Sequence, residues 1–302
     1  MTRLAVNVGF LFRELPYLER FTAARASGFD AVEFAWPTEP VDDVARAVGA
    51  AGLGAALINV AAGDLAAGER GHANDPAARD RWRADFEAAQ RLADAVGCPA
   101  LNVLAGNRVA GVPMIAQLDT LRANLDWALP RARDAGRILT LELLNPDDTP
   151  RYLLTDPARI RALLEAVGDP ALRLQFDTYQ FGRVVPDVTA AFREVAALVG
   201  HVQVGDVPDR HEPGTGSVEW LSFFAALDEL GYAGAIGLEY DPRAGTFEGL
   251  GWIETYGLER SASEATARRS ESSSPTLPGK TTRTTPGWRP PSTRHTGTPG
   301  SS

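Results

Sequence analysis

The chain of 302 residues has very little cysteine and very little lysine. Its one cysteine, Cys98, excludes an internal disulfide and a thiolate zinc site, which is typical of proteins in a reducing cytoplasm. Its one lysine, Lys280, lies in the last 23 residues, so arginine supplies nearly all of the 30 basic side chains. Schiff-base chemistry, pyridoxal phosphate attachment and a P-loop all need a positioned lysine, and we exclude them unless Lys280 folds back.

Long apolar runs and excess positive charge are also missing. No segment approaches the ~18 apolar residues that span a bilayer, and the first residues, MTRLAVNVGF, lack the long apolar stretch of a signal peptide. With 39 acidic residues the formal charge is −9, which argues against binding nucleic acid through its phosphates. We therefore expect a cytoplasmic protein with neither a membrane nor a nucleic acid as partner.

The composition changes after Arg260. Ser, Thr, Pro and Gly make up 28 of the 42 residues in 261–302, and large apolar side chains are almost absent there. Such a segment cannot bury enough surface to offset its ordering entropy, so we predict a disordered tail over 261–302. The tail has six basic and two acidic residues, a charge of +4, which leaves −13 on residues 1–260.

Residues 1–260 alternate between two kinds of segment. Short runs rich in Val, Leu, Ile and Phe predict buried parallel strands, and stretches of helical period lie between them. Eight strands with intervening helices in this length predict a single-domain (β/α)8 TIM barrel; the alternative, a doubly wound sheet, lacks a G-x-G-x-x-G after its first strand. The predicted strands are Leu4–Gly9, Asp30–Ala35, Gly54–Val60, Ala100–Ala105, Ile138–Asn145, Leu172–Asp177, His201–Asp206 and Ala235–Tyr240, and the clearest helices are Tyr17–Ser27, Ala77–Val96, Ile115–Asp134, Pro157–Val167 and Val218–Leu230.

Four consecutive strands carry a polar residue that their apolar neighbours do not explain: Glu142, Asp177, Gln203 and Glu239. In a barrel these side chains would converge at the carboxyl ends of the strands, where active sites lie. Buried carboxylates are costly unless they are paired, and no lysine is available to pair with them. Oxygen-only ligands favour Mg²⁺ or Mn²⁺, so the four residues predict a divalent metal site; the alternative is pairing with arginines such as Arg70.

Loops supply the candidate substrate contacts. The segment NVAAGDLAAGERGHA after the third strand contains Arg70, which could hold a carboxylate in a bidentate way, and His72. Glu33 and Asn102 lie at strand ends, and His201 opens the seventh strand. The loop HEPGTG after that strand is a weak phosphate-binding signal, and a simple chain reversal is the favoured interpretation.

Taken together, the stretches GFDAVEF, AAGDLAAGERG, ILTLELLN, LQFDTYQ, GHVQVGD, HEPGTG and GLEY resemble the hydroxypyruvate isomerase family of xylose-isomerase-like barrels, over residues 3 to 257. The resemblance implies that Glu142, Asp177, Gln203 and Glu239 bind the metal, and that Glu142 and Glu239 transfer protons. It implies further that Arg70 contacts the substrate carboxylate. The sequence departs from the family at Gln180, where a histidine is usual; glutamine can bind a substrate oxygen but does not shuttle protons near neutral pH.

The predicted reaction is the isomerisation of a small 2-oxo or hydroxy acid, hydroxypyruvate to 2-hydroxy-3-oxopropanoate, through an enediolate. We assign substrate binding to Arg70, His72, Asn102 and Gln180. The alternatives are a 2-oxo-tetronate isomerase, a keto-sugar epimerase, or a catalytically silent barrel that binds a metabolite. An endonuclease of the same superfamily would need a histidine-rich site for several zinc ions and a basic surface. The chain has only four histidines and is acidic, which disfavours this alternative. No subunit interface can be identified, which leaves a homo-oligomer open.

Overall fold

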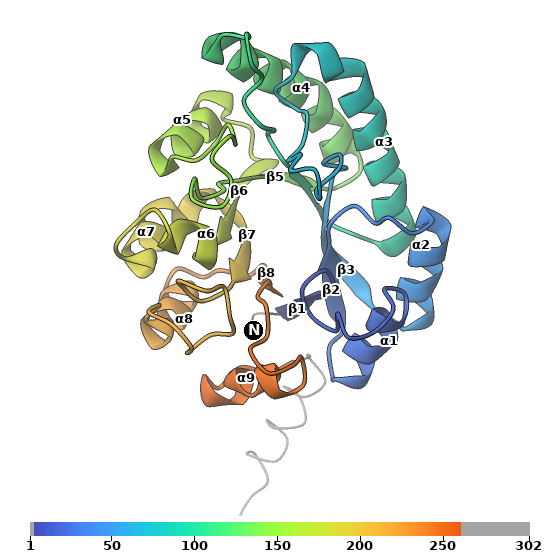
Figure 1. Ribbon diagram of the computed structural model, residues 1–302, viewed down its shortest axis with the longest axis vertical. Helices are drawn as coiled ribbons and strands as arrows, with labels where there is room; N and C mark the ends of the chain where they lie inside the picture. Colours follow the sequence, from blue (N-terminus) through green and yellow to red (C-terminus); the bar gives the residue numbers. More distant parts are fainter. Residues whose placement is uncertain (1–2, 261–302) are drawn as a thin grey trace, which may run out of the picture.

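The computed structural model describes residues 3–260, which form a closed barrel of eight parallel strands surrounded by helices (Figure 1). The strands follow one another around the barrel in chain order, and β1 pairs with β8 to close it. The (β/α)8 prediction is therefore confirmed, while the predicted tail, 261–302, lies outside the described residues. The strands are β1 (Arg3–Asn7), β2 (Ala31–Phe34), β3 (Gly54–Asn59), β4 (Ala100–Val103), β5 (Ile138–Glu142), β6 (Leu172–Asp177), β7 (Val199–Val204) and β8 (Ala235–Leu238).

The helices cover the outside of the barrel (Figure 1). All five predicted helices are present, and residues 3–260 contain four further ones, α2, α6, α7 and α9. The helices are α1 (Glu19–Ala26), α2 (Val41–Ala50), α3 (Arg79–Val96), α4 (Met114–Asp134), α5 (Pro157–Val167), α6 (Thr178–Gly182), α7 (Val188–Val195), α8 (Trp220–Glu229) and α9 (Trp252–Thr255), with short 3-10 turns η1 (Pro76–Ala78), η2 (Ala196–Leu198) and η3 (Glu248–Leu250).

Local chemistry defines where these helices begin and end. At α5, the carboxylate of Asp156 accepts a hydrogen bond from the Ala158 N–H, and Pro157 occupies the first turn, where its missing N–H costs nothing. The same helix ends at Gly168, whose φ of 63° is the left-handed conformation that glycine adopts without strain. The predicted and observed bounds of α5 therefore agree.

The apolar core lies between the barrel and the helices. Trp82 and Phe86 of α3 pack against Trp127 of α4, and Phe176 of β6 packs against Phe192 of α7. Burying each such side chain contributes roughly 1.5–3 kcal/mol. None of the helices within residues 3–260 is both long enough and apolar enough to cross a membrane.

The interior of the barrel contains many polar side chains. Because side chains alternate along a strand, each strand sends one set of residues outward to the helices and the other set inward. The buried polar side chains on the strands include Asn7, Glu33, Asn102, Thr140, Gln175, His201 and Gln203. Their hydrogen bonds run from strand to strand across the barrel, and this network supports the carboxyl ends of the strands.

Candidate active site

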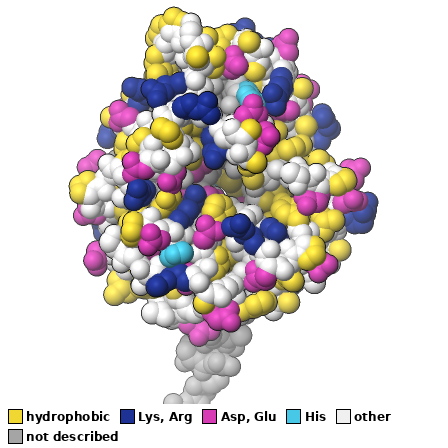
Figure 2. Space-filling view, in the orientation of Figure 1, with side chains coloured by type: hydrophobic (Ala, Val, Ile, Leu, Met, Phe, Trp, Pro, Cys, Tyr) yellow, Lys and Arg dark blue, Asp and Glu magenta, His cyan; other side chains and the backbone are white. Residues whose placement is uncertain are grey.

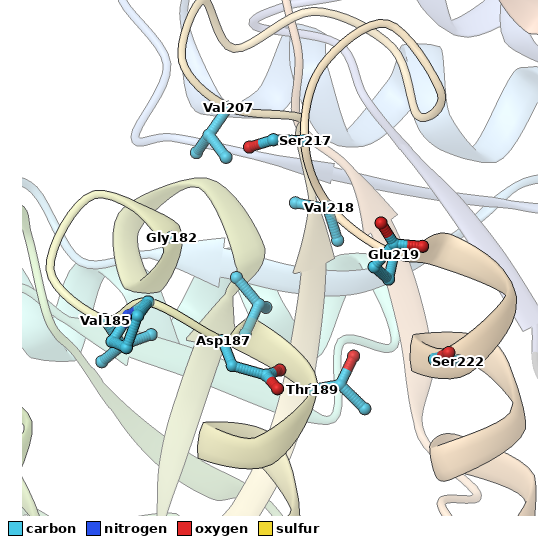
Figure 3. A pocket seen from close by; sticks show the side chains of 11 residues that line it. Gly182, Val185, Asp187, Thr189, Val207, Ser217, Val218, Glu219 and Ser222 are labelled. Carbon is cyan, nitrogen blue, oxygen red and sulfur yellow. The ribbon is translucent and has the colours of Figure 1, made fainter.

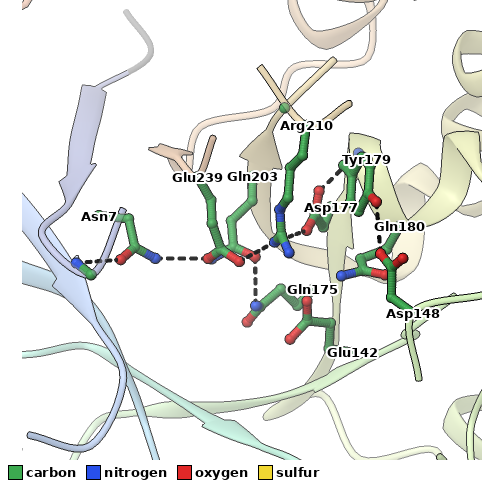
Figure 4. A network of polar contacts seen from close by, with 12 residues as sticks. Asn7, Glu142, Asp148, Gln175, Asp177, Tyr179, Gln180, Gln203, Arg210 and Glu239 are labelled. Atoms are coloured by element: carbon green, nitrogen blue, oxygen red, sulfur yellow. Dashed lines mark hydrogen bonds and ion pairs between the residues drawn. The ribbon is translucent and has the colours of Figure 1, made fainter. Parts of the chain in front are cut away.

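Three carboxyl groups meet at the mouth of the barrel (Figure 4). Glu142 ends β5, Asp177 ends β6 and Glu239 directly follows β8. Each offers a carboxylate oxygen within 4.8 Å of the others, and this is the one group of at least three acidic, histidine or cysteine side chains with such spacing within residues 3–260. The convergence expected from the strand positions is therefore present in the structure.

A cation that the sequence interpretation missed pairs with this cluster. Arg210, in the loop after β7, donates from Nη2 to Oδ2 of Asp177 at 3.0 Å and also to Oε1 of Glu239. Its guanidinium carbon lies 4.6 Å from the ring centre of Phe10 and 4.9 Å from that of Tyr179. No lysine reaches the cluster within residues 3–260, as expected, but the alternative of arginine pairing is realised by Arg210 instead of Arg70, because its long side chain reaches from the loop into the mouth.

One arginine does not balance three carboxylates, of which Glu142 and Asp177 are buried and Glu239 is partly buried. Burial raises the pKa of Glu142 to about 8, and it raises those of Asp177 and Glu239 as well, the last of them far above its ordinary value. Arg210 stays protonated: burial lowers its pKa, but Asp177 and Glu239 more than compensate. The excess of negative charge and the all-oxygen donor set fit a divalent cation, which Glu142, Asp177 and Glu239 could hold.

The fourth predicted ligand, Gln203, borders the cluster through its amide nitrogen. Nε2 of Gln203 donates to Oε1 of Glu33 at 2.7 Å and to Oε2 of Glu239, while its Oε1 accepts from Nε2 of Gln175 at 2.7 Å. Thr140 Oγ1 in turn donates to Gln175 at 3.0 Å. In this arrangement the amide oxygen of Gln203 already has a partner, and its role as a metal ligand stays a prediction.

Asn102 and Gln180, two of the predicted substrate residues, lie beside the cluster. Nδ2 of Asn102 donates to Oε2 of Glu142 at 2.9 Å, so this side chain contacts a carboxylate of the cluster. Oε1 of Gln180 accepts from both the backbone N–H and Nδ2 of Asn145, each at 2.8 Å. Both positions are compatible with substrate contact, which stays a prediction.

The other two predicted substrate residues lie in the loop after β3. Nη1 of Arg70 donates to the carbonyl oxygens of Leu65 and Glu69, at 3.0 and 2.7 Å. Nε2 of His72 lies 3.7 Å from Oε2 of Glu69 and has no hydrogen-bond partner. The structure gives neither side chain a contact with Glu142, Asp177 or Glu239, and their assignment to the substrate stays a prediction.

The glycine-containing loop after β7 is a chain reversal closed on an internal carboxylate. Oδ2 of Asp206 accepts from the backbone N–H groups of Gly214 and Gly216, both at 2.9 Å, and from Nε1 of Trp220 at 2.8 Å. Oδ1 accepts from the N–H groups of Val207 and Val218. The N–H groups that a phosphate would need are therefore occupied, and the phosphate interpretation is wrong.

Of two sizeable cavities in the structure, one borders residues next to the cluster. One of about 440 Å³ is lined by Trp36, Asn59, Leu65 and Leu104 among others, and Asn59 pairs in register with Asn102, which contacts Glu142. The other, of about 420 Å³, lies beside the first turns of α7 and α8 (Figure 3) and contains none of the predicted site residues. The face in Figure 2 is hollowed at its centre, with basic and acidic side chains around the opening.

A parallel (β/α)8 barrel with buried carboxylates at the carboxyl ends of its strands defines a class of enzymes that act on small molecules in the barrel mouth. Residues 21–256 match the family described as xylose isomerase-like TIM barrel, and the chain belongs to that family.

Similar proteins with known names indicate which kind of enzyme within this family the chain resembles. The chain is 39% identical to 2-oxo-tetronate isomerase of Cupriavidus necator over 85% of its own length and 99% of that protein. It is 34% identical to hydroxypyruvate isomerase of Escherichia coli, over 85% of this chain and 100% of that protein. The crystal structure of an AP endonuclease, family 2, from Brucella melitensis superposes with a TM-score of 0.80 at 33% identity, covering 85% of this chain and 99% of that one. The prediction of an isomerase of the hydroxypyruvate isomerase kind is confirmed.

Proposed function

We propose that the protein is a metal-dependent isomerase that interconverts hydroxypyruvate and 2-hydroxy-3-oxopropanoate. The observation that carries the proposal is the convergence of Glu142, Asp177 and Glu239 at the barrel mouth, in a chain related to isomerases of small oxo acids. A bound Mg²⁺ or Mn²⁺ would polarise the carbonyl and hydroxyl oxygens of the substrate and make its carbon-bound proton more acidic. Glu142, Asp177 and Glu239 would hold this ion, with Gln203 beside it.

The protein side chains would carry out the proton transfers. One glutamate removes the proton from C3 of hydroxypyruvate, the electron pair forms the C2–C3 double bond of an enediolate, and a glutamate delivers a proton to C2. The hydroxyl proton on O3 passes to O2 in the overall reaction, so the product has the same composition as the substrate. Glu142 and Glu239 are the candidates for the base and the acid.

Arg210 would stabilise the anionic substrate. Its Nε is buried and has no hydrogen-bond partner, so a donor is free for an oxygen of the substrate carboxylate or of the enediolate. The rings of Phe10 and Tyr179 hold the guanidinium beside the cluster, which limits the entropy lost when the substrate binds. Asn102 and Gln180 would supply further polar contacts, as would Arg70 and His72 from the loop after β3.

A four-carbon substrate is the second candidate. The relative from Cupriavidus necator is named for a 2-oxo-tetronate, and the cavity of about 440 Å³ between Trp36 and Leu104 offers room for a longer substrate chain. An endonuclease is disfavoured, because the metal-capable group within residues 3–260 contains no histidine.

The test is a panel of three- and four-carbon oxo acids assayed in D₂O with Mg²⁺, with Mn²⁺ and with EDTA. We expect deuterium in the product, activity that EDTA removes, and a loss of about 10²- to 10⁴-fold in kcat for Glu142→Gln and for Glu239→Gln. Glu165→Gln, an exposed change on α5, is the matched control and should retain wild-type kcat. A Glu239→Gln variant with full activity, or a wild-type protein that binds these acids without exchanging deuterium, would contradict the proposal.

A further inference from the structure

Glu33 is a fully buried carboxylate below the acidic cluster that the proposed mechanism does not use. It lies on β2, and its side chain is enclosed by polar groups from two other strands, β1 and β7. Oε1 accepts from Nδ2 of Asn7 at 3.1 Å and from Nε2 of Gln203 at 2.7 Å, and Oε2 lies 2.6 Å from Nε2 of His201. A buried carboxylate with this many partners has a defined orientation.

Both amides that contact Glu33 also contact Glu239. Nδ2 of Asn7 donates to Oε2 of Glu239 at 2.7 Å, and Nε2 of Gln203 donates to the same oxygen (Figure 4). Carboxylates accept hydrogen bonds, so each amide must turn its nitrogen toward the two glutamates. Oε2 of Glu239 is thus held from two sides, while its Oε1 faces Arg210.

The barrel leaves a space in which Glu33 fits. A methyl group on Gly237 would lie 2.2–2.4 Å from the three atoms of the Glu33 carboxyl group, so a larger residue at this position of β8 would displace the carboxylate from its present place. His201 on β7 closes the other side of the carboxylate. The hydrogen bonds to Glu33 and the space beside Gly237 together hold the Glu33 side chain in one orientation.

We propose that Glu33 is a positioning residue for Glu239: it binds the amides of Asn7 and Gln203 so that both nitrogens fix Oε2 of Glu239. The inference rests on the proposed function for the role of Glu239 in proton transfer. Glu33 itself touches no reacting atom. Without its acceptor oxygen each amide loses one of its hydrogen bonds and keeps those to Gln175 or Gly9 and to Glu239. The carboxylate of Glu239 is then held less firmly in the orientation that proton transfer needs.

The test compares Glu33→Leu with Glu33→Gln in the full-length protein. Leucine removes the acceptor, whereas the Oε1 of glutamine can still accept from Asn7 and Gln203, so the pair separates positioning from charge. We expect kcat to fall about 10- to 100-fold in Glu33→Leu with KM changed less than about threefold, and glutamine to restore most of kcat. NMR of the side-chain amides in the substrate-free protein is the second readout: the Asn7 and Gln203 protons should exchange faster in Glu33→Leu than in wild type or Glu33→Gln.

Gly237→Ala should displace the Glu33 carboxylate while leaving residue 33 a glutamate. It is the alternative test if Glu33→Leu does not fold. It should lower kcat as Glu33→Leu does, and combining it with the shorter Glu33→Asp should recover part of the loss. Wild-type kcat and amide exchange in folded Glu33→Leu or Gly237→Ala would overturn the inference. If wild type converts no oxo acid, the proposed function fails, and the amide exchange rates alone decide the role of Glu33.

Discussion

At the scale of single residues, Gln180 shows how a neighbour determines what a side chain offers. Asn145 donates twice to its Oε1, and within residues 3–260 its Nε2 has no hydrogen-bond partner. The amide therefore presents N–H groups toward the side of the cluster (Figure 4). An amide does not titrate near neutral pH, so this contact with a substrate oxygen would not depend on pH.

We predict that Gln180→Glu raises KM about tenfold and leaves the fold intact. The carboxylate can still accept both hydrogen bonds from Asn145, but it has no N–H to donate, and losing one such bond to a charged substrate costs about 1.5 kcal/mol. Steady-state kinetics on the oxo-acid substrate measures the change. Gln90→Glu makes the same chemical change on α3, far from the cluster, and should leave KM unchanged. An unaltered KM in Gln180→Glu would mean that Nε2 does not bind the substrate.

The residues of the site differ in how well the sequence predicts them. Glu142, Asp177 and Glu239 stand out because each is a carboxylate beside apolar strand residues, and strand order then places them together. Arg210 gives no such signal: it lies in a polar loop, and its contact with the cluster depends on a backbone φ of 58° and on the rings of Phe10 and Tyr179. The orientation of Gln203 depends on Glu33, 170 residues earlier in the chain, so the local sequence carries no trace of it.

At the scale of an element, the loop over residues 207–218 is built around Asp206. Four backbone N–H groups and the Trp220 indole donate to this buried carboxylate, and the loop contains Arg210. The Gly-Thr-Gly pattern alone does not distinguish a loop that binds an external anion from one that binds its own side chain. What distinguishes them is Asp206, two residues after the end of β7, which only the folded loop brings among these N–H groups.

We predict that Asp206→Ala destabilises the protein by at least about 3 kcal/mol, because it leaves several buried N–H groups without an acceptor. It should also lower kcat, since the loop that holds Arg210 loses its anchor. Urea unfolding and steady-state kinetics measure the two effects. Asp187→Ala removes a carboxylate that accepts from a single N–H, at the start of α7, and should cost about 1 kcal/mol with kcat unchanged. Equal stability losses in the two variants would contradict this account of the loop.

At the scale of the whole molecule, the fold was predictable because apolar strand segments and amphipathic helical segments alternate along the whole chain. A wrong assignment of one segment does not change that overall pattern. Even α2 and α7, absent from the predicted helices, fall in the gaps where the barrel requires them. The interior is different. A core of hydrogen-bonded side chains follows from the packing of eight strands at once, and no single segment reveals it.

The buried cluster makes the stability of the metal-free protein depend on pH. Burial raises the pKa of Glu142 from near 4.5 to about 8, and those of Asp177 and Glu239 also rise. Within this window the folded protein binds more protons than the unfolded chain, so the free energy of unfolding falls as the pH increases. The stabilising contribution is complete below about pH 4.5 and is lost as the pH passes 8.

We predict that, in EDTA, the unfolding free energy decreases steadily from pH 5 to pH 8. Urea unfolding at several pH values measures it, and Glu142→Gln, which cannot ionise, should flatten the slope. A saturating divalent cation should raise the stability most at the alkaline end, because binding to the folded state alone stabilises it. A pH-independent unfolding free energy in EDTA would show that the carboxyl groups keep their ordinary acidity.

The polar interior of the barrel also bears on how this protein can change. Asn7, Glu33, Gln203 and Glu239 share donors and acceptors, so replacing one of them removes a hydrogen bond from two of the others. Such substitutions become tolerable only when a compensating one occurs across the barrel, on a strand distant in sequence. We therefore expect these positions to vary together among relatives, and efforts to redirect the enzyme to another substrate to succeed sooner in the loops than in the strands.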